Sequence, residues 1–230
     1  ERNKFLASDR SVLSHLISQV PERTCLSYVE HSESNLPFLS LAETRYYIDL
    51  ADFGHSLDGY LASFSGKHRK NLRHDLQRLS SLCPSVHFNR LDDYDRMAQL
   101  NIERFGDESF FKEPFFYCGF RRFLELAKNR GELRMISIDV GGVTQSVEVA
   151  VQYNGEYSVL MGGTNIAVSN VGKLMVLEHI KHAIENKAGI IDFLATDSGW
   201  KRLWNMKEEP VYYFANYDVD AEEAGKNRRY

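Results

Sequence analysis

The chain has 230 residues, of which 43% are hydrophobic and 26% are charged. This length suits one large domain or a domain with an extension, and the composition is ordinary for a globular protein. A formal net charge of −4 and a pI of about 6.1 do not favour a general nucleic-acid binder. The three cysteines are widely spaced, which indicates neither a disulfide framework nor a zinc site.

The sequence carries no pattern that would place the chain in or across a membrane. No apolar run approaches the roughly 20 residues that a membrane-spanning helix needs. Residues 1–4, which open the chain, do not resemble a signal peptide, and unpaired thiols are typical of a reducing compartment. We therefore expect a cytoplasmic protein, with an oligomeric state that the sequence leaves open.

Apolar spacing divides the first half of the chain into helical and extended segments. The predicted elements are a helix at 10–20, strands at 26–29 and 44–50, a helical segment at 56–82, and helices at about 92–105 and 115–130. Within 56–82, Leu72, Leu76 and Leu79 form the apolar stripe. Gly131 marks the end of the last of these helices.

Three strands in the second half are joined by turns that are typical of hairpins. The Gly141-Gly142 and Asn154-Gly155 pairs both favour a tight turn between antiparallel strands. The predicted elements are strands at 133–140, 144–153 and 156–162, a helix at 171–187, a strand at 190–194, a short helix at 200–206 and a strand at 211–215. This order predicts an α/β fold with a mixed, mostly antiparallel sheet flanked by helices.

The turn that opens the helix at 171–187 is the first candidate binding site. Ser169 or Asn170 could cap this helix, which would leave free amides that can hold a phosphate. The residues expected to contact a phosphate are Asn170, Val171, Gly172, Lys173 and Leu174. Lys173 would add a positive charge. The alternative is an ordinary strand-to-helix turn that needs one flexible residue.

A basic segment within 56–82 is the second candidate. It contains Lys67, His68, Arg69, Lys70, Arg73, His74 and Arg78. Arg69 and Arg73 lie one helical turn apart and share a face, so they could bind phosphates or another anionic group of a ligand. The alternative is a solvated helix face. No aromatic residues are interleaved with these charges, so direct stacking of nucleic-acid bases is unsupported.

Several side chains near the last strands are candidates for the reaction itself. Asp192 lies in a strand that should be buried, where a carboxylate is costly unless it is paired. It could act as a general base or be a structural partner of Lys201 or Arg202. Lys201 could instead neutralise an oxyanion. Trp200 and Trp204 could line a substrate pocket, although Trp204 could equally fill the core.

The sequence predicts no metal site and no thiol mechanism. His179 and His182 lie three residues apart, but no third ligand accompanies them. Cys118 has no neighbouring His or Asp in the sequence that would make it a nucleophile. We therefore expect a reaction without a bound metal and without a covalent enzyme intermediate.

Three stretches together resemble the FemAB-like branch of the GNAT superfamily of acyltransferases. They are residues 60–73, residues 171–183 and residues 189–204, and the likeness spans about residues 58–205. The resemblance implies a GNAT fold and a transferase whose usual donor is acyl-coenzyme A, with acetyl-coenzyme A included. In the peptidoglycan-bridge members of this branch the donor is aminoacyl-tRNA.

The resemblance also assigns roles to individual residues. Glu148 lies on one face of the strand at 144–153 and Tyr153 on the other, and the place of that strand in a GNAT fold makes Glu148 a candidate general base beside Asp192. Tyr153 is a candidate for contact with the acceptor. The expected acceptor is an amine of a small molecule, a glycan or a peptide, in cell-envelope or polysaccharide metabolism.

The resemblance to this family leaves two other functions open. Aminoacyl-tRNA could be the donor, which the basic segment favours. Alternatively, the chain could be an inactive interaction module, because Leu174 stands where the glycine loop of the family usually has a small residue. The expected organisation is an N-terminal extension at 1–57, a GNAT-like domain at 58–217 and a tail at 218–230.

Overall fold

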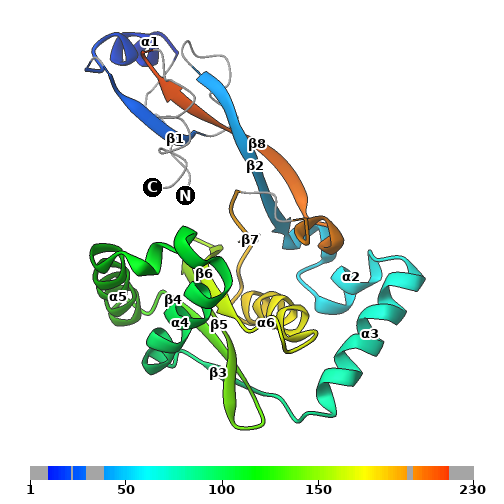
Figure 1. Ribbon diagram of the computed structural model, residues 1–230. Coiled ribbons are helices and arrows are strands. Elements are labelled where there is room, and N and C mark those ends of the chain that lie inside the picture. Colours follow the sequence, from blue (N-terminus) through cyan, green and yellow to red (C-terminus); the bar gives the residue numbers. More distant parts are fainter. Residues whose placement is uncertain (1–9, 22, 30–38, 196–198, 218–230) are drawn as a thin grey trace. The chain divides into compact units, whose positions relative to one another are not determined.

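The computed structural model describes residues 10–21, 23–29, 39–195 and 199–217 (Figure 1). The chain divides into two compact units, one of residues 47–193 and one that combines residues 1–46 with 194–230. The predicted tail at 218–230 lies outside the described residues, as does part of the predicted extension at 1–57. The boundary expected at residues 57 and 58 stays a prediction.

A twisted sheet forms the centre of the larger unit. Its strands are β3 (Ser85–Phe88), β4 (Leu133–Val140), β5 (Val143–Tyr153), β6 (Glu156–Thr164), β7 (Ile190–Asp192) and the end of β2 (Leu39–Asp49). They lie in the order β2-β7-β6-β5-β4-β3. Only β6 and β7 are parallel, and every other neighbouring pair in this unit is antiparallel. The predicted fold class is confirmed.

The meander β4-β5-β6 follows from its two turns. Gly141 and Gly142 have φ angles of 62° and 76°, and Asn154 and Gly155 have φ angles of 49° and 78°. Such positive φ angles suit glycine and asparagine and match the twist of a tight hairpin. The turns therefore set the register that the site depends on, in which Glu148 lies opposite Gly162.

Helices cover both faces of this sheet. The helices of this unit are α2 (Leu57–Ala62), α3 (Gly66–Ser80), α4 (Tyr94–Phe105), α5 (Pro114–Asn129) and α6 (Val171–Glu185), with 3-10 turns at Leu50–Phe53, Leu91–Asp93, Gly106–Glu108 and Phe110–Lys112. Helices α4 and α5 lie on one face and α6 on the other (Figure 1). Because strand residues alternate between faces, each face has its own apolar cluster.

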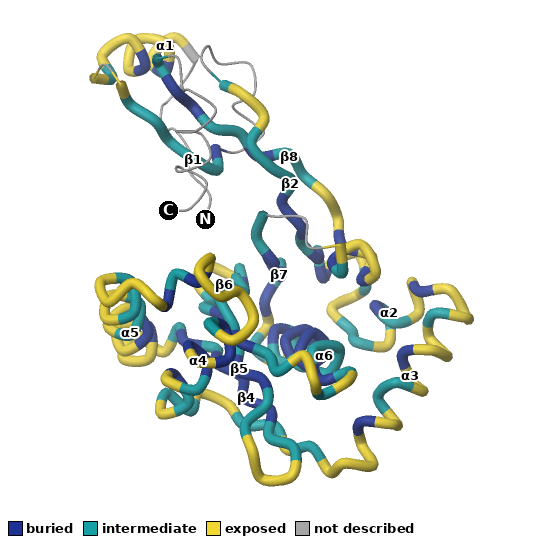
Figure 2. Tube along the Cα trace, viewed as in Figure 1, coloured by how far each residue is buried: buried dark blue, intermediate teal, exposed yellow. Residues whose placement is uncertain are grey.

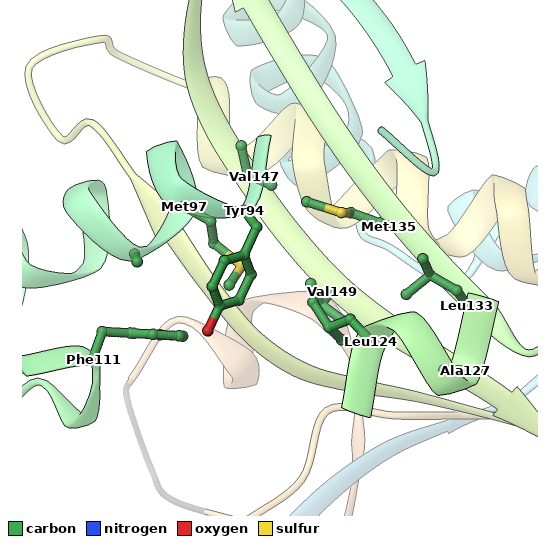
Figure 3. Packing of buried hydrophobic residues seen from close by; sticks show 10 residues of the cluster. Tyr94, Met97, Phe111, Leu124, Ala127, Leu133, Met135, Val147 and Val149 are labelled. Carbon is green, nitrogen blue, oxygen red and sulfur yellow. The ribbon is translucent and has the colours of Figure 1, made fainter. Parts of the chain in front are cut away.

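The cluster under α4 and α5 is the larger one (Figure 3). Its buried members are Tyr94, Met97, Ala98, Phe111, Leu124, Ala127, Leu133, Met135, Val147 and Val149. On the opposite face, Ile136 and Ile138 of β4 pack against Val171 and Met175 of α6. Figure 2 shows α6 buried along most of its length, whereas α3 keeps an exposed face.

The smaller unit contains α1 (Arg10–Ser18), β1 (Cys25–Val29), the first part of β2, a 3-10 turn at Lys201–Trp204 and β8 (Lys207–Ala215). Strands β1 and β8 are antiparallel. Their apolar cluster contains Leu13, Ile17, Val29 and Phe214. No described helix of either unit is long and apolar enough to cross a membrane.

Five parts of the secondary structure differ from the sequence predictions. The helical segment at 56–82 is two helices, because Ser63 ends α2 and the Ser65 hydroxyl caps α3 by accepting from the amide of His68. The short helix at 200–206 is a 3-10 turn. Strand β3 was missed, and β2 and β8 begin earlier than expected.

Candidate active site

Strands β6 and β7 stop pairing after a short parallel stretch. Their register pairs Glu156, Tyr157 and Ser158 with residues of β7, and β6 then continues to Thr164. In this unit no described strand pairs with that edge of β6 beyond Ser158. The register with β5 also shifts between Val149 and Ala150, which places a β-bulge in the same part of β6. Backbone groups at this edge are therefore available to an extended ligand.

The N-terminus of α6 lies at the same end of the sheet. Register places Ile138, Ser146 and Thr164 side by side, and Ile138 packs against the first turn of α6. Asn170 is the N-cap residue with a φ of 68°, and its side chain makes no capping hydrogen bond. A helix N-terminus near an open strand edge is suited to an anionic part of a ligand.

The free amides of this turn are fewer than we expected. The amides of Lys173 and Leu174 both donate to the carbonyl of Asn170, at 3.0 and 3.1 Å. No described residue accepts from the amides of Val171 or Gly172, so these two remain available. The expectation that Lys173 and Leu174 would offer free amides to a phosphate was wrong, because the carbonyl of an N-cap residue accepts the first hydrogen bonds of its helix.

Gly172 has no local structural reason to be glycine. It has helical backbone, and a Cβ at this position would have no described atom within 4 Å. Glycine in a helix costs roughly 0.5–1 kcal/mol relative to alanine. The Leu174 side chain does not occupy the open space, because it packs at the edge of the cluster of Ile136 and Ile138. No described atom thus obstructs the approach of a ligand to the position of that Cβ.

Lys173 is already engaged within the protein. Its ammonium group donates to Asp75 of α3, and this hydrogen bond lowers the pKa of the Asp75 carboxyl below its ordinary value. The side chain of Lys173 is nevertheless 43% exposed. The contact ties α6 to α3 and brings the basic helix close to the phosphate-binding candidate.

Glu148 lies on the face of β5 that α6 covers, and glycine makes room for it. A Cβ on Gly162 would lie 2.3 Å from Cγ of Glu148. The carboxylate is 24% exposed, and its Oε2 lies 3.2 Å from Nε2 of His179. The carboxylate of Glu148 therefore lies beside a ring nitrogen of buried His179 and is itself still accessible to a substrate.

His179 belongs to a buried polar cluster that the sequence did not reveal. Its Nδ1 lies 2.9 Å from the hydroxyl of Tyr157, which in turn lies 3.5 Å from Nδ1 of His182. Burial raises the pKa of Tyr157 and lowers the pKa of His182 to about 4. The only signal in the sequence was the spacing of the two histidines along one helix face, which we had considered for metal binding alone.

Asn101 of α4 is a second residue that sequence reasoning missed. Its amide donates to the carbonyl of Gly162 at 2.7 Å, and its own carbonyl oxygen accepts from the hydroxyl of Ser109. Gly163, which follows Gly162 in β6, packs against the backbone of α4. These contacts fix the part of β6 that lies opposite Glu148.

The sequence model of the family described as the acetyltransferase (GNAT) domain matches residues 66–202. The chain belongs to this family. The match includes the basic helix, the meander and the turn at Gly172, and therefore supports acyl transfer as the general chemistry.

Solved structures share the fold of this GNAT chain. The structure of L-PGS from Bacillus licheniformis has a TM-score of 0.65 at 13% identity and covers 95% of this chain and 76% of that one. The structure of FemX has a TM-score of 0.60 at 11% identity, with 89% and 77% covered. Both likenesses agree with a FemAB-like GNAT protein, as the sequence resemblance predicted.

A curated relative matches a smaller part of the GNAT chain. L-rhamnose-1-dehydrogenase from Scheffersomyces stipitis is 28% identical over 99 residues, which are 43% of this chain and 37% of that protein. The chain therefore spans about a third of the length of this relative. A match of this extent says nothing about the activity of the chain.

The basic helix of the GNAT domain does not present Arg69 and Arg73 equally. Arg69 donates to the carbonyls of Ala62 and Phe64, at 2.9 and 2.6 Å, and so closes the end of α2. Arg73 is exposed and makes no polar contact with a described residue. The other exposed basic side chains of α3 are Lys67, Lys70, His74 and Arg78. Arg73 is thus the freer of the two to bind an anion.

The remaining site candidates lie in different parts of the chain. Asp192 is only 1% exposed, and Tyr153 is 63% exposed near the end of β5. In the smaller unit, Lys201 is buried and donates to the carbonyls of Leu194 and Ala195. Trp204 is buried and Trp200 is half-buried. The proposed roles of these residues, including a pair between Lys201 and Asp192, stay predictions.

The described residues hold no group of three His, Cys, Asp or Glu side chains that could bind a metal ion.

Proposed function

We propose that this chain transfers an acyl group from acyl-coenzyme A to an amine. The observation that carries the proposal is the unobstructed start of α6 at Gly172, at the end of the sheet where no described strand pairs with β6 beyond Ser158. Acyl-coenzyme A has an extended pantetheine arm and a pyrophosphate. The strand edge suits the arm and the two free amides of α6 suit the pyrophosphate.

Glu148 is the better candidate for the base. Its carboxylate is 24% exposed, whereas Asp192 is 1% exposed, and an acceptor amine must reach the group that takes its proton. In the proposed reaction a neutral amine attacks the thioester carbonyl directly, and the proton that its nitrogen gives up as it adds passes to Glu148. The C–N bond forms as the C–S bond breaks, and the thiolate of coenzyme A leaves.

The acceptor is proposed from chemistry alone as an amine on a small molecule, a glycan or a peptide. A cell-envelope or polysaccharide substrate agrees with the FemAB-like resemblance. Positioning of the amine against the thioester would supply most of the rate, since oriented reactants gain about 7–11 kcal/mol over free ones. We expect Tyr153, Trp200 and Trp204 to contribute to acceptor binding, and Lys201 or Asp192 to assist.

Calorimetry with the full chain tests the donor. We expect saturable binding of acetyl-coenzyme A or of a longer acyl-coenzyme A. Acetyl-pantetheine, which lacks the pyrophosphate and nucleotide, should bind at least tenfold more weakly if the α6 turn holds the pyrophosphate. No binding across a series of acyl chain lengths would reject the proposal. Equal binding of the two acetyl compounds would show that the α6 turn does not hold the pyrophosphate.

The exposed basic face of α3 favours a second candidate, in which aminoacyl-tRNA is the donor. Lys67, Lys70, Arg73 and Arg78 are all exposed on one short helix, and such a face suits a phosphate backbone. The net charge of −4 weighs against it. The third alternative, an inactive module, is weakened because Leu174 does not obstruct the start of α6 at Gly172.

Charge reversal separates the two donors. The variant Arg73→Glu should weaken tRNA binding and reduce its salt dependence if RNA is the donor, yet leave acetyl-coenzyme A binding within twofold. Arg69 is unsuitable for this test because it also closes α2. Unchanged RNA binding in Arg73→Glu and in Lys70→Glu would count against the second candidate.

A further inference from the structure

The buried ring of His179 is held at both nitrogens. The residue is 0% exposed and lies on α6 over the middle of the sheet. Its Nδ1 contacts the hydroxyl of Tyr157 on β6 at 2.9 Å, and its Nε2 lies 3.2 Å from Oε2 of Glu148 on β5. The Nε2 contact has the distance of an ion pair without the alignment of a hydrogen bond. Two strands and one helix therefore fix the ring.

Tyr157 decides which ring nitrogen carries the proton. Burial raises the pKa of Tyr157 well above its ordinary value, so the phenol keeps its proton and has one hydrogen to donate. Of its two histidine neighbours, His179 at 2.9 Å is much closer than His182 at 3.5 Å. A hydroxyl that donates to Nδ1 of His179 leaves the single proton of the neutral ring on Nε2.

The carboxylate favours the same arrangement. An N–H dipole at Nε2 attracts the Oε2 of Glu148, whereas the other tautomer would place a lone pair against it. Both contacts of the ring therefore select one tautomer. We propose that Tyr157 fixes His179 with its proton on Nε2, and that this N–H positions the Glu148 side chain. This inference rests on the proposed function where it treats Glu148 as the base.

The other groups of the cluster do not reverse this preference. Burial lowers the pKa of His182 to about 4, so its ring is neutral at pH 7. The charge of Arg134 of β4 acts on Tyr157 and on His182, together with Glu148 on Tyr157 and His179 on His182. Arg134 itself binds the side chain of Gln152 and the carbonyls of Gly131 and Leu133.

His179 is a positioning residue in this scheme, because it acts through Glu148 and not on the substrate. The Tyr157–His179–Glu148 arrangement resembles the way in which a buried acid orients a catalytic histidine, with the roles of base and orienting group exchanged. Removal of the Tyr157 hydroxyl should release the tautomer preference without changing the shape of the core.

Nitrogen NMR of the full chain, labelled with ¹⁵N in histidine, tests the proposal directly. At pH 7 we expect His179 to show a protonated Nε2 and an unprotonated Nδ1. In Tyr157→Phe the same signals should move toward those of a mixture of tautomers. The matched control is Tyr94→Phe, which removes a buried tyrosine hydroxyl hydrogen bond on the opposite face of the sheet. A wild-type His179 protonated on Nδ1, or on both nitrogens, would overturn the proposal.

The kinetic constants of acetyl-coenzyme A turnover give the second readout. In Tyr157→Phe kcat should fall by about tenfold with little change in KM, because a base that loses a fixed contact is less well positioned against the amine. Tyr94→Phe should leave both constants in place. A loss of kcat of equal size in both variants would assign the effect to stability and contradict the proposal. If the chain turns over no acyl-coenzyme A, the proposed function fails, and the NMR result still decides the tautomer.

Discussion

Glu148 and Gly162 face each other across β5 and β6, and the glutamate side chain fills the space that a Cβ on the glycine would need. Such a Cβ would lie 2.3 Å from Cγ of Glu148 and 3.0 Å from the carbonyl oxygen of Val147. The position of the proposed base therefore depends on the absence of one methyl group from the neighbouring strand.

Gly162→Ala should displace the carboxylate and lower activity. Insertion of a methyl group into a packed site costs about 1–3 kcal/mol, and a base that is misplaced by about 1 Å can lose about 10²-fold in rate. Urea unfolding and acyl transfer measure the two effects. The double variant Gly162→Ala with Glu148→Ala should regain part of the stability, since the atom that clashes is gone, but none of the activity. Full activity in the single variant would contradict the role of this glycine.

Glu148→Gln should separate chemistry from binding. The amide keeps the size of the side chain but cannot accept a proton from an ammonium group. We expect kcat to fall by about 10²–10⁴-fold, the usual contribution of a general base, while the affinity for acetyl-coenzyme A changes less than threefold. An unchanged kcat would remove Glu148 from the reaction. Asp192→Asn, measured in the same assay, would then be the next candidate.

Gly163→Ala should damage the fold itself. A Cβ at this position would lie 2.3 Å from the carbonyl oxygen of Met97 and 2.8 Å from the amide nitrogen of Asn101, both in the backbone of α4. Because a helix backbone cannot move as a side chain can, we expect a loss of about 3 kcal/mol or more in the free energy of unfolding. A loss below 1 kcal/mol in urea unfolding would show that α4 does not pack so closely on β6.

The meander could be predicted from the sequence because the residues of its turns favour tight hairpins by themselves. Asn154-Gly155 and Gly141-Gly142 supply the positive φ angles of tight hairpins, whatever the rest of the chain does. Strand β3 could not be found in the same way. Its four residues, Ser85–Phe88, are not flanked by a hairpin turn, and they form a strand only because β4 pairs with them.

The candidate site was harder to predict than the fold. Its residues Glu148 and Gly172 could be chosen, because a carboxylate in a strand and a glycine at a helix start are visible in the sequence. The contacts of His179 with Tyr157 and Glu148 depend on strand register and on how α6 sits over the sheet. No local pattern encodes that distance, so the histidine was considered only as a metal ligand.

The pair of Lys173 and Asp75 should make a small, pH-dependent contribution to stability. The hydrogen bond from Lys173 lowers the pKa of Asp75. An acid with a lowered pKa in the folded state stabilises the protein above its unfolded pKa, about 3.9, and the gain is lost as the pH falls through the folded pKa. Asp75→Asn should therefore cost less than about 1 kcal/mol at pH 7, since the pair is partly exposed.

Urea unfolding of both proteins across the acid range checks this assignment. The wild-type and Asp75→Asn midpoints should differ at pH 7 and converge as the aspartate is protonated. A difference that stays constant with pH would assign the effect of the substitution to packing and not to the charge of Asp75.

Gly172→Ala should change stability and binding in opposite directions. A Cβ at this position meets no described atom, so alanine should raise the free energy of unfolding of the unliganded protein by about 0.5–1 kcal/mol through its helix preference. If a pyrophosphate approaches the free amides of Val171 and Gly172, the same methyl group obstructs it. The dissociation constant for acetyl-coenzyme A should then rise about tenfold or more.

Gly119→Ala is the matched control for this variant. Gly119 also lies in a helix, α5, with no described atom within 4 Å of a Cβ, and should gain similar stability with no change in binding. Thermal unfolding with and without acetyl-coenzyme A gives both quantities, because a ligand that binds only the folded state raises the melting temperature. Equal ligand-induced shifts in the two variants would mean that Gly172 is an ordinary helix-start glycine and that the donor lies elsewhere.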